Sequence, residues 1–272
     1  MMTDRTRAGT DQPRFTVRHG GCSDRGQVRK RNEDSFLTAA PYFIVADGMG
    51  GHSNGQDASQ TAVETFRPRN DLMWATSEGV IGGISKAAAA IRRLPGTGRP
   101  PGSTIAGVGL SIQSGHPCWL VFNIGDSRVY LLRRGLLTQI TADHSIRHEG
   151  PDSISRNVIT RALGGGLTQP LQPDQWLIPA LPHDQLLICS DGLYIDLTQQ
   201  LMTAILLGDG NPQRKAEALV DAANAAGGRD NATAVVVVAD DVAPVSGAAM
   251  RINEATVRDD ETETAQEEEL VP

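Results

Sequence analysis

The fold is decided by residues 43–52, Phe-Ile-Val-Ala-Asp-Gly-Met-Gly-Gly-His, in which an apolar run passes into a glycine-rich segment. Residues 43–46 predict a short buried strand, because four apolar residues bounded by turn-forming residues are typical of a sheet core. The strand ends at Asp47, and the glycines that follow predict a tight turn with uncovered carbonyl groups. A carboxylate at such a bend suits a hard cation.

Three further aspartates stand beside apolar runs that predict strands. They are Asp126 after residues 120–124, Asp191 after residues 186–190, and Asp230 before residues 232–239. A single Asp-Gly pair is usually an ordinary turn, but four aspartates at strand ends can converge on one rim of a sheet. They would repel one another without cations between them. Together with Asp47, they therefore predict a cation site.

Length and composition predict one domain with two loose ends. A single β-rich domain can reach about 250 residues, and the chain has 272. We expect a flexible N-terminus at 1–14, one folded domain at 15–240 and an acidic disordered tail at 241–272. No apolar run approaches the ~20 residues that cross a bilayer, and the first residues lack the apolar stretch of a signal peptide. The sequence therefore predicts a cytoplasmic protein without a membrane span.

The net charge of -7 belongs to the C-terminal end, because residues 240–272 hold ten acidic residues against two arginines. The remainder is close to neutral, so the acidity says nothing about the partners of the folded domain. The arginine-rich first thirty residues raise the alternative of a nucleic-acid-binding module. That alternative lacks interleaved aromatic residues and a basic core, so we expect no nucleic-acid partner.

The three cysteines, Cys22, Cys118 and Cys189, are odd in number and lack the spacing of a metal site. Each lies in or beside an apolar run, which favours buried reduced thiols over a disulfide framework.

The order of predicted elements favours an α+β fold. Helices are expected at 57–66 and 84–94, at 197–207, and from the Asn211-Pro212 start to Gly227, with an irregular segment at 67–83. Between and around these pairs we predict strands at 15–23, 35–39, 105–112, 118–124, 129–132, 136–140, 184–190 and 231–239, and a surface flap at 143–157. Two helix pairs separated by many strands favour two packed sheets with the helices outside.

The loop between the first two predicted strands is dense in charge. Arg29 offers a planar fork to a phosphate, while Glu33 and Asp34 could face a cation. The alternative is an ordinary solvated turn.

With these motifs, the sequence resembles the type 2C (PPM-type) metal-dependent serine/threonine protein phosphatases, and in particular their bacterial branch. The resemblance covers residues 16–240, and seven motifs in the family's order carry it. They are Ser23-Asp24-x-Gly26 with Arg29 and Asn32-Glu33-Asp34, Asp47-Gly48-Met49-Gly50-Gly51-His52, Gly102-Ser103-Thr104, Gly125-Asp126-Ser127-Arg128, Asp143-His144-Ser145, Ser190-Asp191-Gly192, and Asp230-Asn231-Ala232-Thr233.

The resemblance implies an α-β-β-α sandwich, with two central, mainly antiparallel sheets flanked by helix pairs and a binuclear Mn²⁺ or Mg²⁺ centre. By motif, Asp47 would bridge the two ions and the Gly48 carbonyl would bind one of them. The other expected metal ligands are Asp191 and Asp230, Glu33 and Asp34 directly or through water, and Asp126 with Asp191 at a third, weaker site. Arg29 corresponds to the phosphate-binding arginine.

The implied reaction is hydrolysis of phosphoserine and phosphothreonine in proteins by a metal-bridging water. The implied partners are phosphorylated proteins and a cognate serine/threonine kinase, and we expect a monomer. His52 is a candidate general acid, although the family's acid histidine directly follows the Asp-Gly pair and Met49 stands there here; a metal-bound water is the alternative. We expect His144 to brace its loop, and the flap to be shorter than in bacterial relatives.

A catalytically weak relative that binds phosphoproteins is the alternative function. Such a protein should have lost a metal ligand, whereas all four motif aspartates are present.

Overall fold

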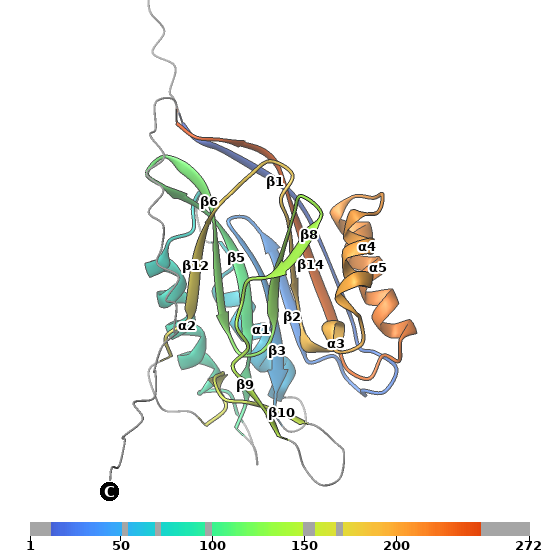
Figure 1. Cartoon of the computed structure of the whole chain (residues 1–272). Coiled ribbons are helices and arrows are strands. Elements are labelled where there is room, and N and C mark those ends of the chain that lie inside the picture. The colour runs from blue at the N-terminus through green and yellow to red at the C-terminus, as the bar shows by residue number, and fades with distance from the viewer. Residues whose placement is uncertain are drawn as a thin grey trace, which may run out of the picture.

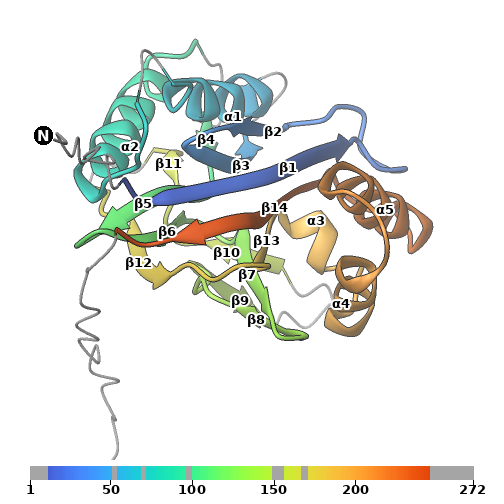
Figure 2. The ribbon, with the colours of Figure 1, turned by 90° about the horizontal axis from the view of Figure 1, so that it is seen from above.

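The computed structural model describes residues 12–50, 54–68, 72–95, 100–148, 156–166 and 171–245. Figures 1 and 2 show helices on the two outer sides of the molecule and strands between them. The predicted α-β-β-α sandwich is therefore confirmed.

The first sheet has five strands in the order β1-β14-β13-β7-β8, and every neighbouring pair is antiparallel. Its strands are β1 (Arg14–Asp24), β14 (Ala232–Ala243), β13 (Gln185–Cys189), β7 (Arg128–Arg133) and β8 (Leu136–Gln139).

The second sheet has seven strands in the order β11-β4-β3-β5-β6-β12, with β2 paired to β3 off this path. Its strands are β2 (Asp34–Ala39), β3 (Tyr42–Met49), β4 (Gly102–Ser103), β5 (Ile105–Gln113), β6 (His116–Ile124), β11 (Leu163–Gly164) and β12 (Asp174–Pro179). A separate antiparallel pair, β9 (Ser145–His148) and β10 (Arg156–Ile159), lies within the predicted flap.

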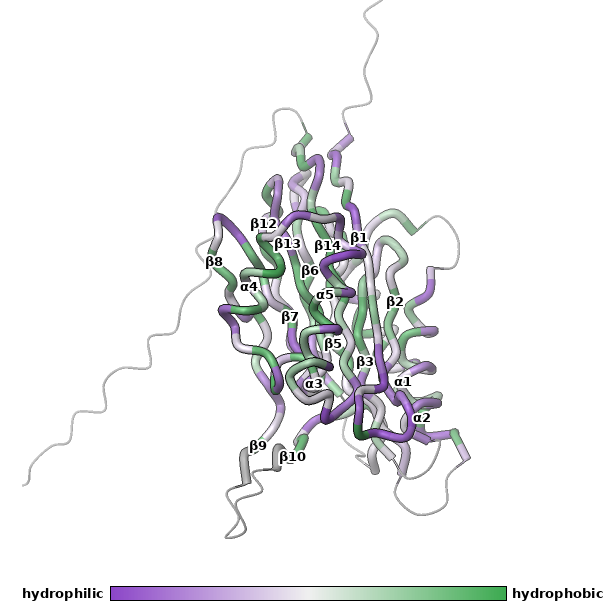
Figure 3. The backbone as a smooth tube through the Cα atoms, turned by 90° about the vertical axis from the view of Figure 1, so that its right-hand side faces the viewer, coloured by the Kyte–Doolittle hydropathy of each residue, from purple (hydrophilic) through white to green (hydrophobic). Residues whose placement is uncertain are grey.

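Successive residues of the central strands point to opposite faces of their sheet, and each face packs in its own hydrophobic cluster. In β3, Phe43 and Val45 pack in the cluster between the two sheets, while Ile44 packs in the cluster beneath the first helix pair. In β14, Val235 joins the cluster between the sheets and Val236 the cluster beneath the other helices. A strand covered on both faces needs hydrophobic residues at every position, and Figure 3 shows hydrophobic colouring along these central strands.

The helices cover the outer faces of the sheets. Helices α1 (Asn54–Thr65) and α2 (Ser77–Ile91) pack on the second sheet, and α3 (Asp191–Tyr194), α4 (Gln199–Leu207) and α5 (Pro212–Ala225) pack on the first. The predicted start of the last helix is confirmed, because the Asn211 side chain accepts a hydrogen bond from the Arg214 N–H and Pro212 opens the helix.

The prediction of an irregular segment up to residue 83 was wrong, because α2 already begins at Ser77. A Cβ at Gly83 would lie 2.6 Å from the Phe66 ring. Glycine is present there to let the helix approach Phe66, and it does not break the helix.

The predicted turn directly after Asp47 was also wrong. Strand β3 continues through Gly48 and Met49, which pair with Ser103 and Gly102 of β4. This pairing extends the strand, and it depends on a segment distant in sequence. Strand β12 was not predicted at all, and β14 runs on to Ala243.

Within the described ranges, no helix combines the length and the apolar character that a membrane span requires. The three cysteines are free thiols, with Cys118 and Cys189 buried and Cys22 partly buried.

Candidate active site

Five aspartates lie at the same end of the two sheets, near α3 and the β9–β10 pair in the lower part of Figure 1. Asp34 opens β2 and is the register partner of Asp47 in β3. The other three stand at element ends: Asp126 after β6, Asp191 at the start of α3 and Asp230 before β14. The antiparallel pairing of the strands brings these chain positions to one rim.

The electrostatics of Asp47 shows that the five carboxylates converge. The pKa of Asp47 is raised well above its usual value, first by burial and then by the negative charges of Asp34, Asp191, Asp126 and Asp230. Like charges raise a carboxyl pKa only when they lie close to it. The convergence predicted from the sequence is thus present, with Asp34 as an additional member.

Burial is also the first cause of the raised pKa of Asp191, Asp126 and Asp34. It raises the pKa of Asp191 to about 8, with added repulsion from Asp126 and Asp230. The pKa of Asp126 is raised to about 6 and that of Asp34 to about 6, again mainly by burial. A buried cluster of this kind favours protons or cations between its members.

Asp34 is held by two hydroxyl groups. Its Oδ2 accepts hydrogen bonds from Ser190 Oγ at 2.6 Å and from Thr233 Oγ1 at 2.7 Å. Its Oδ1 is buried without a partner among the described residues. Sequence reasoning quoted Ser190 and Thr233 only as motif members, and no local pattern could have revealed that they bind Asp34.

The backbone of Asp47 is fixed by the Ser103-Thr104 pair. The Asp47 N–H donates to Thr104 Oγ1 at 2.9 Å, and its carbonyl accepts from the Thr104 N–H at 2.8 Å and from Ser103 Oγ at 3.1 Å. This explains why a Gly-Ser-Thr motif accompanies the aspartate: it holds the end of β3 in place.

Glu33 and the Gly48 carbonyl meet at Gly55, in the first turn of α1. A Cβ on Gly55 would lie 2.7 Å from Glu33 Oε1 and 2.9 Å from the Gly48 oxygen. The Gly48 N–H in turn donates to the Glu33 carbonyl at 3.1 Å. Gly55 therefore leaves room for two oxygen ligands predicted from the sequence, and no local pattern around Gly55 pointed to this role.

Arg29 lies beside the cluster, with its Nη2 2.6 Å from Asp230 Oδ2. Its pKa is raised, first by this hydrogen bond, and further by the charges of Asp230, Asp47 and Asp191. The side chain is 52% exposed, so the guanidinium stands at the open side of the carboxylate cluster, where a phosphate could approach.

Asn231 fastens the charged β1–β2 loop to β14. Its Oδ1 accepts from the Glu33 N–H at 2.8 Å, and its Nδ2 donates to the carbonyls of Arg25 and Arg31 at 2.9 Å each. The loop is therefore held in place against β14 and is not a freely solvated turn.

His144 braces its loop, as predicted. Its backbone N–H donates to the Gly125 carbonyl at 2.9 Å, and its Nδ1 accepts from the Gly125 N–H at 3.1 Å. His52, the candidate general acid, lies outside the described residues.

The donor set fits divalent cations that prefer oxygen ligands. Asp34 Oδ1 and Asp126 Oδ1 are both buried without a partner among the described residues, an arrangement that is costly unless something binds them. Within the same residues, no three His, Cys, Asp or Glu side chains lie together as a ready metal-ligating group. The residues thus fit metal binding by their chemistry and their unpartnered oxygens.

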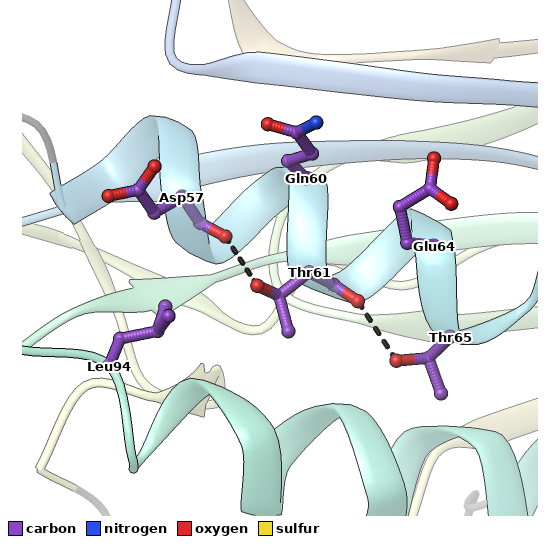
Figure 4. Close-up of a pocket in the computed structure, with 6 residues that line it drawn as sticks. All are labelled: Asp57, Gln60, Thr61, Glu64, Thr65 and Leu94. Atoms are coloured by element: carbon purple, nitrogen blue, oxygen red, sulfur yellow. Dashed lines mark hydrogen bonds between the residues drawn. The ribbon is translucent and has the colours of Figure 1, made fainter.

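A groove of about 380 Å³ lies elsewhere, on α1 beside the end of α2 (Figure 4). It contains none of the five clustered aspartates. Its Thr61 and Thr65 hydroxyls donate to helix carbonyls, those of Asp57 and Thr61, so the carboxylate cluster is the better candidate for chemistry.

Comparisons with known proteins identify relatives along most of the chain, although no family model matches it. The chain is 30% identical to the serine/threonine phosphatase stp of Listeria monocytogenes over 239 residues, which cover 80% of this chain and 94% of that protein. It is 33% identical to the serine/threonine protein phosphatase PstP of Mycobacterium tuberculosis over 240 residues, which cover 82% of this chain and 45% of that longer protein.

A solved structure of the catalytic domain of PstP in complex with two manganese ions has the same fold. It matches this structure with a TM-score of 0.69 and 32% identity, covering 84% of this chain and 100% of that one. With these relatives matched over most of its length, the chain belongs to the bacterial type 2C (PPM-type) serine/threonine phosphatases.

Proposed function

We propose that this chain hydrolyses phosphoserine and phosphothreonine in proteins and so reverses the action of a serine/threonine kinase. The observation that carries the proposal is the convergence of five aspartates beside Arg29. The relatives named above as serine/threonine phosphatases support the same activity.

The cofactor we propose is Mn²⁺ or Mg²⁺, as two ions. Asp47 would bridge them, with the Gly48 carbonyl on one ion, and Asp191 and Asp230 would hold the other. Glu33 and Asp34 would serve directly or through water, and Asp126 with Asp191 would form a third, weaker site. The two manganese ions of the PstP structure support this proposal. When bound, such cations supply an activated water and positive charge at phosphate oxygens.

The residues of the chain have separate tasks in this reaction. Arg29 is anchored through Nη2 by Asp230, and its remaining N–H groups can bind the non-bridging phosphate oxygens as charge spreads over them. Ser190 and Thr233 keep Asp34 oriented. We retain His52 as a candidate proton donor to the leaving serine or threonine oxygen, with water as the alternative.

We further propose that the protein acts as a cytoplasmic monomer on phosphorylated proteins, beside a cognate kinase, without a nucleic-acid or membrane partner. Its free cysteines are compatible with a reducing compartment. The near-neutral charge of residues 1–239 gives no electrostatic attraction to nucleic acid.

The test is hydrolysis of a phosphothreonine peptide by the purified chain with Mn²⁺, with Mg²⁺ and with a chelator. We expect metal-dependent turnover that Asp191→Ala abolishes, while Asp209→Ala, at an exposed position after α4, retains it. If the folded, metal-loaded wild type shows no turnover, the proposed phosphatase activity is refuted and the phosphoprotein-binding alternative is favoured.

A further inference from the structure

Both strands of the β9–β10 pair join the body of the protein at residues that contact one carboxylate, Asp174 at the start of β12. His144 immediately precedes β9, and its Nε2 lies 3.1 Å from Asp174 Oδ2. Arg161 follows β10 closely, and its Nη1 donates to Asp174 Oδ1 at 2.8 Å. The Thr160 N–H also donates to the His144 carbonyl at 2.8 Å. The two ends of the pair are therefore fastened together.

The opposite edge of the His144 ring contacts the residue next to a proposed metal ligand. The Gly125 N–H donates to His144 Nδ1, and Gly125 directly precedes Asp126. Asn123 Nδ2 adds two more bonds, to the carbonyls of Gly125 and Ala142, at 3.1 Å each. One imidazole thus bridges Asp174 and the Asp126 loop.

The ring is contacted through both of its nitrogen atoms. Its Nδ1 faces the Gly125 N–H, and its Nε2 faces Asp174 Oδ2. Arg161 Nη1 lies 2.8 Å from the same Nε2. The Asp174 carboxylate thus contacts both the imidazole and the Arg161 guanidinium.

Asp126 is also held from its other side. Its carbonyl accepts a hydrogen bond from the Tyr194 hydroxyl at 3.0 Å. The Arg128 guanidinium lies 3.6 Å from the centroid of the Tyr194 ring and forms a fork with Asp143, its Nη2 2.6 Å from Oδ2. The chain around Asp126 is thereby tied on both sides to the segment that leads into β9.

We propose that His144, Arg161 and Asp174 form a positioning latch, which sets the place of Asp126 from the base of the β9–β10 pair. The inference rests on the proposed function in that Asp126 is taken as a ligand of the weaker cation site. Asp126 is 2% exposed and its Oδ1 has no partner among the described residues. Its position is therefore set by the backbone contacts that the latch controls.

The test compares Asp174→Asn with Asp184→Asn. Asp184 is a matched control, because it also receives an arginine fork, from Arg133 at 2.8 and 2.7 Å, at the end of β13 remote from the cluster. Binding of Mn²⁺ alone to the full metal-free chain is measured by titration calorimetry. The same titration of Asp126→Ala identifies the binding step that depends on Asp126. The ¹⁵N shifts of the His144 imidazole report the contacts and protonation of its two ring nitrogens.

We expect Asp174→Asn to weaken the Asp126-dependent step about tenfold or more, the range for residues that orient metal ligands, and to change the ¹⁵N shifts of the His144 ring. Asp184→Asn should change neither. If Asp174→Asn does not fold, Arg161→Lys, which keeps the charge but loses the fork, gives the same comparison.

Three results would overturn the latch: an unchanged binding step with unchanged His144 ¹⁵N shifts in Asp174→Asn, an equal loss in Asp184→Asn, or no binding step that depends on Asp126. Failure of the proposed function looks different, because it would appear as absent turnover in a wild type that still shows the Asp126-dependent binding step and its loss in Asp174→Asn.

Discussion

At the scale of single residues, the missing side chain of Gly55 leaves the space in which two proposed metal ligands lie. A Cβ there would press on Glu33 Oε1 and on the backbone oxygen of Gly48, at 2.7 and 2.9 Å. The Gly48 oxygen is part of a paired strand and cannot retreat, so the Glu33 side chain must move. We expect Gly55→Ala to lower Mn²⁺ affinity about tenfold, measured by calorimetric titration.

The control for Gly55→Ala is Gln56→Ala, at the neighbouring exposed position of α1. Equal affinities in wild type and Gly55→Ala would show that Glu33 and the Gly48 carbonyl are not ligands.

The hydroxyl pair on Asp34 makes a second residue-scale prediction. Thr233→Val keeps the shape of the side chain but leaves Asp34 Oδ2 with Ser190 as its remaining hydroxyl donor. Losing a buried hydrogen bond to a charged group costs about 1.5–3 kcal/mol. We expect metal-dependent turnover to fall at least about tenfold and to recover partly at higher metal concentration.

Thr138→Val on β8, where the side chain is exposed, should retain wild-type turnover. A Thr233→Val variant with wild-type metal dependence would contradict the role assigned to the pair.

At the scale of elements, α2 contains adjacent glycines with opposite expected effects. A Cβ at Gly83 would lie 2.6 Å from the Phe66 ring, whereas a Cβ at Gly82 would meet nothing within 4 Å. We expect Gly83→Ala to lower the free energy of unfolding by about 1–3 kcal/mol through overpacking. Gly82→Ala should raise it by about 0.5–1 kcal/mol, because alanine favours a helix.

Urea denaturation of the two variants beside wild type measures both effects, and each serves as the control for the other. Similar changes in the two variants would mean that α2 does not pack against Phe66 as described.

At the scale of the whole molecule, the carboxylate cluster couples stability to pH and to metal. Burial raises the pKa of Asp34 and Asp126 to about 6 and that of Asp191 to about 8 from the usual 3.8. The folded state thus binds protons more strongly than the unfolded state. The resulting stability is present at low pH and is lost as pH rises through these folded-state pKa values.

We therefore expect the metal-free chain to melt several degrees lower at about pH 8 than at about pH 5. Adding Mn²⁺ at about pH 8 should reverse the loss, because a cation replaces the protons. Thermal melts of wild type and Asp191→Asn measure this, and the variant should depend less on pH. If the melting temperature of the metal-free chain rises with pH over this range, the carboxylates are not the source of the coupling between stability and pH.

The sequence by itself indicated the layered fold, because short apolar runs bounded by turn residues favour strands, and two helix pairs separated by many strands favour two packed sheets with the helices outside. It placed aspartates at the strand ends, and the last helix carried its own start signal at Asn211-Pro212. The resemblance of the seven motifs to the type 2C family then gave the metal ligands and the phosphate-binding role of Arg29 as candidates. The strands and the helix start depend on neighbours in the chain, so a local pattern suffices to predict them.

Only the tertiary structure decided which distant groups meet. The Gly83 contact with Phe66, the pairing of Gly48 with Ser103, the hydroxyls of Ser190 and Thr233 on Asp34, and the bridge from His144 to Asp174 all join separate segments. A glycine needed for close packing looks the same in sequence as one that ends a helix. The physical reason is that hydrogen bonding and steric fit depend on distance in space, which the chain sets only once both sheets have packed.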